Sequence, residues 1–164
     1  MLKQHIQREV ILNGVLNVVI NGGIAWLLFK QLSEVPMWGE HGFGLDLIVT
    51  ACILMFLLTL IVFLLHRSKV AKGKISAQAW DTKKPLHRLL QGLPQTPLLI
   101  ALIFGGLGLF VIAPLTLLAL TVLGINTFSP MDFALFKAVW AGVIAALLIG
   151  PVILLSVCAE RAEN

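Results

Sequence analysis

Three asparagines recur at four-residue intervals in one apolar stretch, and their spacing is the first feature that could do chemistry. Asn13, Asn17 and Asn21 lie within VILNGVLNVVINGGIAWLLF, residues 10–29. Side chains four residues apart share one face of a helix, so the pattern predicts an amide stripe. An amide facing hydrocarbon without a partner is costly. We therefore expect the stripe to face a protein interface or a hydrated groove.

Two interpretations of the stripe are open. Polar side chains inside membrane bundles often hydrogen-bond across helices, and we favour this structural role. The alternative is a polar lining for a solute or a lipid headgroup. Three amides in one span are more than helix packing needs, which supports the alternative.

Charged residues near the ends of the later apolar stretches extend the predicted polar lining: Asp46, Asp132 and Lys137. Helical side chains lean toward the N-terminus, so we expect the Lys137 amine to snorkel to the outer interface. An ion pair with Asp46 or Asp132 is the alternative. No ionisable residue is expected near a bilayer midplane, which argues against a proton relay or an ion-coupled pump.

Catalytic and metal-binding motifs are absent from the sequence. The two cysteines form no CxxC pair and are expected at different membrane depths, and no nucleophile motif, P-loop or HExxH is present. No two histidines share a span at metal-ligand or haem-pairing spacing. The sequence thus predicts a protein that is not an enzyme and has no cofactor and no metal; the residues considered are Cys52, Cys158, His5, His41, His66 and His87.

The composition is that of a membrane protein. Of the 164 residues 59% are hydrophobic and 12% charged, and the mean hydropathy is +0.97, whereas a soluble domain has about 25% charged residues. At about 1.5 Å per residue, roughly 20 apolar residues cross the hydrocarbon layer. We predict an all-α polytopic membrane protein, a four-transmembrane-helix bundle in a single membrane domain, 1–164, with spans at about 10–29, 45–65, 97–123 and 131–158.

The basic residues predict the orientation. Seven of the twelve lie between Arg67 and Arg88, in a loop expected at 66–96, and the positive-inside rule makes this loop cytoplasmic. Both termini are then cytoplasmic, and the localisation is the cell inner (plasma) membrane. The loop suits anionic lipids and has no basic patch interleaved with aromatics, so nucleic acid is not an expected partner. A short interfacial helix is predicted over Pro85–Leu93.

Small residues predict where helices pack closely. Ala138, Gly142, Ala146 and Gly150 recur at four-residue intervals as a small-residue ridge. The glycine pair Gly105 and Gly106 marks a similar face in the third span. Pro114 and Pro151 are expected to kink their spans.

The ridge leads to the favoured functional hypothesis. It predicts a non-enzymatic association or accessory subunit, acting as a homo-oligomer or with a membrane partner protein. The alternative is a small oligomeric permease, in which the asparagine face of the first span lines a polar path between protomers.

Overall fold

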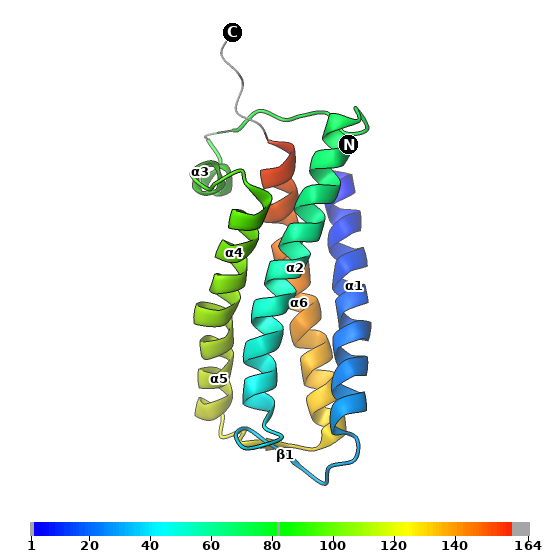
Figure 1. Cartoon of the computed structure of the whole chain (residues 1–164), viewed down its shortest axis with the longest axis vertical. Coiled ribbons are helices and arrows are strands. Elements are labelled where there is room, and N and C mark those ends of the chain that lie inside the picture. Colours follow the sequence, from blue (N-terminus) through cyan, green and yellow to red (C-terminus); the bar gives the residue numbers. More distant parts are fainter. Residues whose placement is uncertain (1, 82, 159–164) are drawn as a thin grey trace.

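Four long helical segments lie side by side in the structure (Figure 1). The computed structural model describes residues 2–81 and 83–158. All four segments are long and apolar enough to span a membrane, which confirms the prediction of an all-helical chain with four candidate spans. The helices are α1 (Leu2–Phe29), α2 (Phe43–Ala71), the short α3 (Pro85–Gln91), a third segment made of α4 (Pro97–Leu107), η1 (Gly108–Ile112) and α5 (Ala113–Val122), and α6 (Pro130–Val157).

Two helices extend further than their apolar stretches. α1 includes the polar residues from Lys3 to Glu9, and α2 continues past Leu65 to Ala71. The predicted loop 66–96 therefore begins six residues too early. Hydropathy marks only the part of a helix that suits hydrocarbon, while residues such as Gln, Glu, Arg and Lys continue a helix readily in water. Within the connection, α3 confirms the predicted short helix.

The third segment contains a π-helical turn directly before Pro114. The backbone N–H of Ala113 donates to the carbonyl of Gly108, five residues earlier. Proline lacks an N–H and clashes with the preceding turn, and a wider turn at this point relieves that clash. The sequence predicted a kink here and missed the π turn. α6 continues through Pro151 as a single helix.

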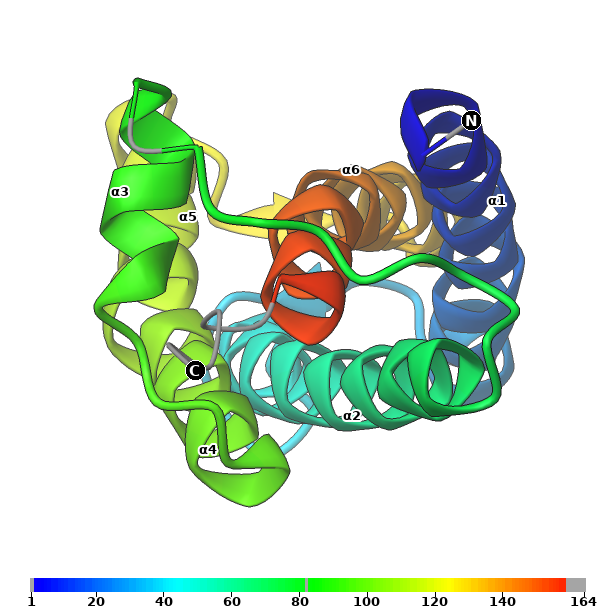
Figure 2. The ribbon, with the colours of Figure 1, turned by 90° about the horizontal axis from the view of Figure 1, so that it is seen from above.

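α6 is the central helix (Figure 2). It packs most extensively against α1 and also against α2, and α2 in turn packs against α4. α1 thus rests mainly on α6, α2 packs on both α6 and the third segment, and α1 and α2 have little contact with each other. One apolar core lies toward the end of the molecule where α1 begins and α6 ends, which we call the terminal end. It surrounds Phe63, Ile100 and Ile153.

A two-stranded sheet joins the loops at the opposite end. β1 (Val35–Pro36) pairs antiparallel with β2 (Thr127–Phe128). Phe43 and Phe133 pack beneath it, with ring centroids 5.5 Å apart, inside the second apolar core. The sequence predicted two separate loops, because a pairing of two residues per strand leaves no periodicity to detect.

The predicted small-residue ridge of α6 contacts α1 within the same chain. A Cβ atom built on Gly142 would lie 2.4 Å from Cγ2 of Val18, and one built on Gly22 would lie 2.7 Å from Cβ of Ala138. Only glycine on one side of each contact permits this approach. The two backbones therefore meet closely along the middle of both helices.

The contact between α1 and α6 continues toward the beginning of α1, where the two helices lie further apart. A Cβ on Gly14 would lie 3.5 Å from Cβ of Ala146, and one on Gly150 would lie 4.0 Å from Ile6. The ridge was predicted to join separate protein molecules. Its close-packing positions are instead occupied by the chain's own first helix, because α1 presents the matching glycines Gly14 and Gly22.

The glycine pair of the third segment divides between packing and exposure. A Cβ on Gly105 would lie 3.0 Å from Cβ of Phe56 on α2, while one on Gly106 would meet nothing within 4 Å. The prediction that Gly106 packs against a helix is wrong, since adjacent helical residues point about 100° apart. Gly108 packs more tightly: its Cβ would lie 2.4 Å from the Ala51 carbonyl oxygen.

This division gives a testable difference between adjacent residues. Gly105→Leu is expected to lower the free energy of unfolding by about 1–3 kcal/mol, the usual cost of overpacking, because Phe56 must move. Gly106→Leu adds a side chain in open space and should leave the free energy of unfolding unchanged. Thermal unfolding in detergent measures both variants, and equal effects would contradict the difference in packing between the two positions.

Candidate functional site

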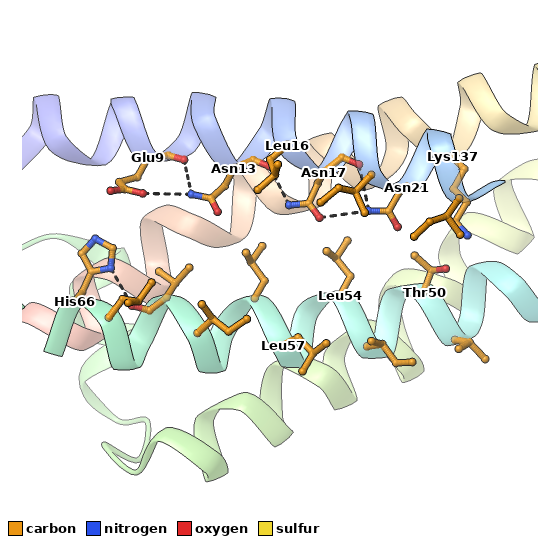
Figure 3. Close-up of a pocket in the computed structure, with 18 of the residues that line it drawn as sticks. Glu9, Asn13, Leu16, Asn17, Asn21, Thr50, Leu54, Leu57, His66 and Lys137 are labelled. Atoms are coloured by element: carbon orange, nitrogen blue, oxygen red, sulfur yellow. Dashed lines mark hydrogen bonds between the residues drawn. The ribbon is translucent and has the colours of Figure 1, made fainter. Parts of the chain in front are cut away.

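A groove of about 660 Å³ runs along the molecule between α1 and α2 (Figure 3). It exists because both helices pack on α6 and have little contact with each other. α1 contributes its asparagine face, α2 contributes a mainly aliphatic wall, and α6 contributes one side chain. The lining residues are Glu9, Asn13, Leu16, Asn17, Ile20, Asn21, Ile24, Asp46, Val49, Thr50, Ile53, Leu54, Leu57, Leu58, Ile61, Val62, Leu65, His66, Lys69 and Lys137.

The three amides hydrogen-bond along their own helix. Nδ2 of Asn13 donates to the Glu9 carbonyl at 2.8 Å, Nδ2 of Asn17 to the Asn13 carbonyl at 2.9 Å, and Nδ2 of Asn21 to the Asn17 carbonyl at 3.2 Å. Cross-helix bonds were the favoured expectation. The bonds of these amide nitrogens run one turn back instead, because a short polar side chain in a helix can reach the backbone carbonyl four residues earlier in the same helix.

This pattern fixes which end of each amide faces the groove. A backbone carbonyl only accepts, so the nitrogen of each amide must point to it. The amide oxygens are then turned outward along the groove, where Asn17 Oδ1 also accepts from Asn21 Nδ2 at 3.3 Å. An amide oxygen has two lone pairs. The α1 wall is therefore a row of hydrogen-bond acceptors.

The opposite wall offers apolar surface. Leu54 of α2 faces the stripe in Figure 3, and Thr50 adds a hydroxyl near the end of the groove where α2 begins. Asn17 and Asn21 are only 8% and 9% exposed. The groove thus combines one polar side with an aliphatic one, an arrangement that suits an amphipathic occupant.

A buried ion pair closes the far end of the groove. Lys137 Nζ lies 2.8 Å from Oδ1 and 2.6 Å from Oδ2 of Asp46, and Lys137 is 2% exposed. The expected snorkelling of the Lys137 amine to the outer interface is wrong, and the ion pair weighed as the alternative is present. Asp46 lies in the first turn of α2, and Lys137 lies about two turns into α6. The Lys137 amine leans toward the start of α6 and meets this carboxylate before it reaches solvent.

Asp132 does not belong to the groove. It is exposed, its backbone N–H is capped by the Ser129 hydroxyl at 3.2 Å, and that hydroxyl donates to its carboxylate at 2.7 Å. The prediction that Asp132 lines a polar path is wrong. A serine three residues ahead makes it part of the N-terminal cap of α6.

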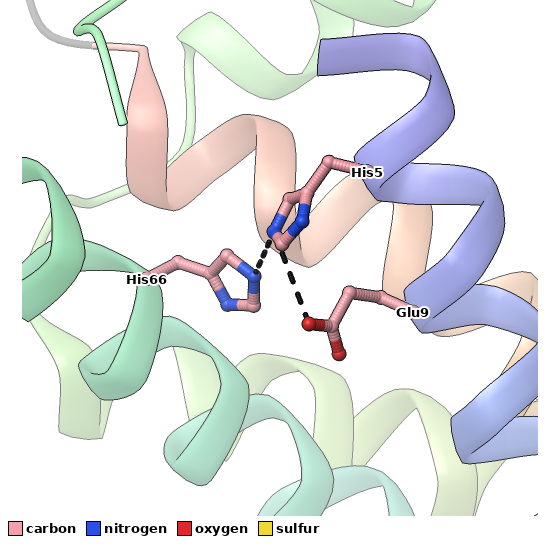
Figure 4. A group of neighbouring side chains, drawn as sticks. All are labelled: His5, Glu9 and His66. Atoms are coloured by element: carbon pink, nitrogen blue, oxygen red, sulfur yellow. Dashed lines mark hydrogen bonds and ion pairs between the residues drawn. The ribbon is translucent and has the colours of Figure 1, made fainter. Parts of the chain in front are cut away.

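A second polar cluster lies at the terminal end of the groove (Figure 4). His5 and Glu9 of α1 meet His66 of α2, with the two histidine Nε2 atoms 3.0 Å apart. Lys69 Nζ lies 3.6 Å from Glu9 Oε1. Sequence reasoning missed this cluster, since His5 and His66 are 61 residues apart; the four-residue spacing of His5 and Glu9 was the available signal.

The two cysteines lie apart in the fold and are both free. Cys52 is half-buried on α2, and Cys158 follows α6 and is 2% exposed. Burial raises the pKa of the Cys158 thiol. A thiol of raised pKa forms little thiolate at neutral pH and reacts slowly.

The structure is that of an all-helical protein with four candidate membrane spans and a groove between two of them. Comparison of the chain with protein-family models, curated proteins and solved structures gave no match. Its function must therefore be argued from the groove itself.

Proposed function

We propose that this is a non-enzymatic, permease-like membrane protein whose groove binds a small amphiphile bearing hydrogen-bond donors. The row of amide oxygens along a groove of about 660 Å³ carries the proposal. Cavities of about 300–1,000 Å³ suit small molecules. A hydroxyl, amine or amide group of such a molecule would donate to the oxygens of Asn13, Asn17 or Asn21 while its apolar part contacts α2.

The distribution of charge supports passive binding or facilitated passage. Ionised groups occur only near the groove ends, with Asp46 and Lys137 at one and Glu9 and Lys69 at the other. A proton relay needs titratable groups within reach of each other along the path. The amides between the two ends offer hydrogen bonds without a titratable group.

We also propose the inner membrane, with both helix termini Leu2 and Val157 on the cytoplasmic side. The last turns of α2 and its connection to α4 lie at that same end (Figure 1) and together hold seven of the twelve basic residues. The positive-inside rule favours this orientation. The same residues would contact anionic lipid headgroups.

Association is the second candidate, and it has a different basis from the ridge of α6. α1 and α2 have little contact with each other, so the groove is open toward lipid between them. A second copy of the chain or a membrane partner would close it and create a path between protomers. The assembled mass in mild detergent tests this candidate directly.

Thiol accessibility tests the groove as an aqueous or ligand-filled site. In a background with Cys52→Ala and Cys158→Ala, single cysteines are placed at Asn13, Asn17 and Asn21. We expect all three to react with a charged, membrane-impermeant thiol reagent in reconstituted vesicles. A thiol must ionise to react, which hydrocarbon prevents.

Val19→Cys is the matched control. It lies on the same helix at similar depth, is 65% exposed and does not line the groove, so it should face lipid and stay unreactive. If cysteines at positions 17 and 21 are as unreactive as the one at 19, the permease-like proposal loses its support. If they react, added candidate amphiphiles can be screened for protection.

A further inference from the structure

The cluster at the terminal end of the groove has the geometry of a metal site. His5 Nε2, His66 Nε2 and a Glu9 carboxylate oxygen all lie within 4.8 Å of one another, and Figure 4 shows the three side chains converging from α1 and α2. The distance from His5 Nε2 to Glu9 Oε1 is 3.9 Å. His66 is 1% exposed, so one ligand is held rigidly inside the protein.

The hydrogen bond of His66 sets its lone pair toward the other ligands. Its Nδ1 lies 2.9 Å from the Val62 carbonyl oxygen. Since a carbonyl only accepts, Nδ1 carries the hydrogen and Nε2 carries the lone pair. Metal-binding histidines are typically oriented in this way, by donating their other ring N–H to a carbonyl or carboxylate.

The spacing of the donor atoms fits a tetrahedral ion. With zinc–nitrogen bonds of about 2.0–2.1 Å, two imidazole nitrogens on one zinc lie about 3.3 Å apart. The observed 3.0 Å between the Nε2 atoms of His5 and His66 is close to this. Without metal, His5 donates an Nε2 hydrogen to His66; binding requires only that this hydrogen move to Nδ1 of His5, with no change in net charge.

Glu9 is oriented by the asparagine stripe. Asn13 Nδ2 donates to Glu9 Oε2 at 3.3 Å, which leaves Oε1 for a metal. Lys69 Nζ lies 3.6 Å from that oxygen. Its side chain is 36% exposed, so the amine can swing into solvent when a dication takes its place.

We propose that His5, Glu9 and His66 bind a divalent transition-metal ion, with Zn²⁺ as the best-fitting ion. Two imidazoles and one carboxylate are a known open zinc ligand set, which leaves a fourth position for water or another ligand. Glu9 and His66 also line the groove, so this position faces its terminal end. The ion would join α1 to α2, which otherwise have little contact with each other.

The test is zinc binding to the full chain, purified without a histidine tag and stripped with a chelator. Isothermal titration with ZnCl₂ should give one equivalent for the wild type. His5→Ala and His66→Ala should each weaken binding by more than the roughly 10–100-fold that loss of an outer-shell partner costs. Asn13→Leu should weaken zinc binding by a factor within that range. Asn17→Leu, one helical turn further along, should bind zinc as the wild type does.

His41→Ala is the control, because His41 is exposed at the opposite end of the molecule. Zinc should raise the melting temperature of the wild type and of His41→Ala but not of His5→Ala, whose partly exposed position makes it the variant safest for folding. Equal zinc binding by the wild type and His5→Ala would overturn the proposal. The site does not depend on the proposed function, since thiol reactivity at positions 17 and 21 is measured without metal.

Discussion

Lys137→Met is expected to lower the free energy of unfolding by about 3–5 kcal/mol, the cost of removing one partner from a buried ion pair. The Lys137 amine is within 2.8 Å of both Asp46 oxygens, and only 2% of the residue is exposed. Without it the Asp46 carboxylate lies in an apolar site with no countercharge. Thermal and chemical unfolding in detergent measure the loss.

A second substitution separates loss of the pair from loss of packing. The double variant Lys137→Met with Asp46→Leu removes both charges, and replacing a buried pair by apolar side chains is often neutral or stabilising. We expect it to recover most of the lost stability. Lys30→Met, at an exposed lysine near the same end, should have little effect. A single Lys137→Met variant as stable as the wild type would exclude a structural role for the pair.

Gly142→Leu is expected to have a comparable effect, exceeding about 3 kcal/mol, the upper end of ordinary overpacking. Its Cβ would lie 2.4 Å from Val18 Cγ2 and 3.1 Å from the Gly14 carbonyl oxygen. Moving Val18 relieves only the first contact, because the second is with backbone. α1 would have to separate from α6, and the groove would lose one wall.

A control at Gly23 of α1 and a rescue variant at Val18 test whether the effect of Gly142→Leu comes from this contact. Gly23→Leu places the same side chain where nothing lies within 4 Å and should leave the melting temperature unchanged. The smaller change Gly142→Ala should be partly rescued by Val18→Ala, which removes the clashing methyl group. If Gly142→Leu dissociates an oligomer while each chain stays folded, the ridge serves association after all.

The packing of Gly142 against α1 and the ion pair between Lys137 and Asp46 together position the walls of the groove. The packing of α1 on α6 fixes the asparagine row, and the ion pair joins α6 to the start of α2. The proposed metal would join α1 to α2 at the other end. Changes at either end should therefore alter the reactivity of a cysteine at position 17, even though neither Lys137 nor His66 contacts Asn17.

The sequence determined the four long apolar helices of the described chain, each a candidate membrane span, because hydropathy and length act locally. A run of about 20 apolar residues satisfies a bilayer whatever its neighbours are. The same locality explains why Asn13, Asn17 and Asn21 could be assigned to one helix face. It also explains the errors at the helix ends, since the polar turns ending at Glu9 and beginning at His66 carry no hydropathy signal.

Only the tertiary structure decided which partners these residues meet. The ridge residue Gly142 could pack against another molecule or against α1, and the glycines of α1 settle this only once both helices are placed. The partner of Lys137 is 91 residues away, and His5 and His66 meet although 61 residues separate them. Pairing at such separations depends on how α1 and α2 divide the surface of α6, which no local pattern encodes.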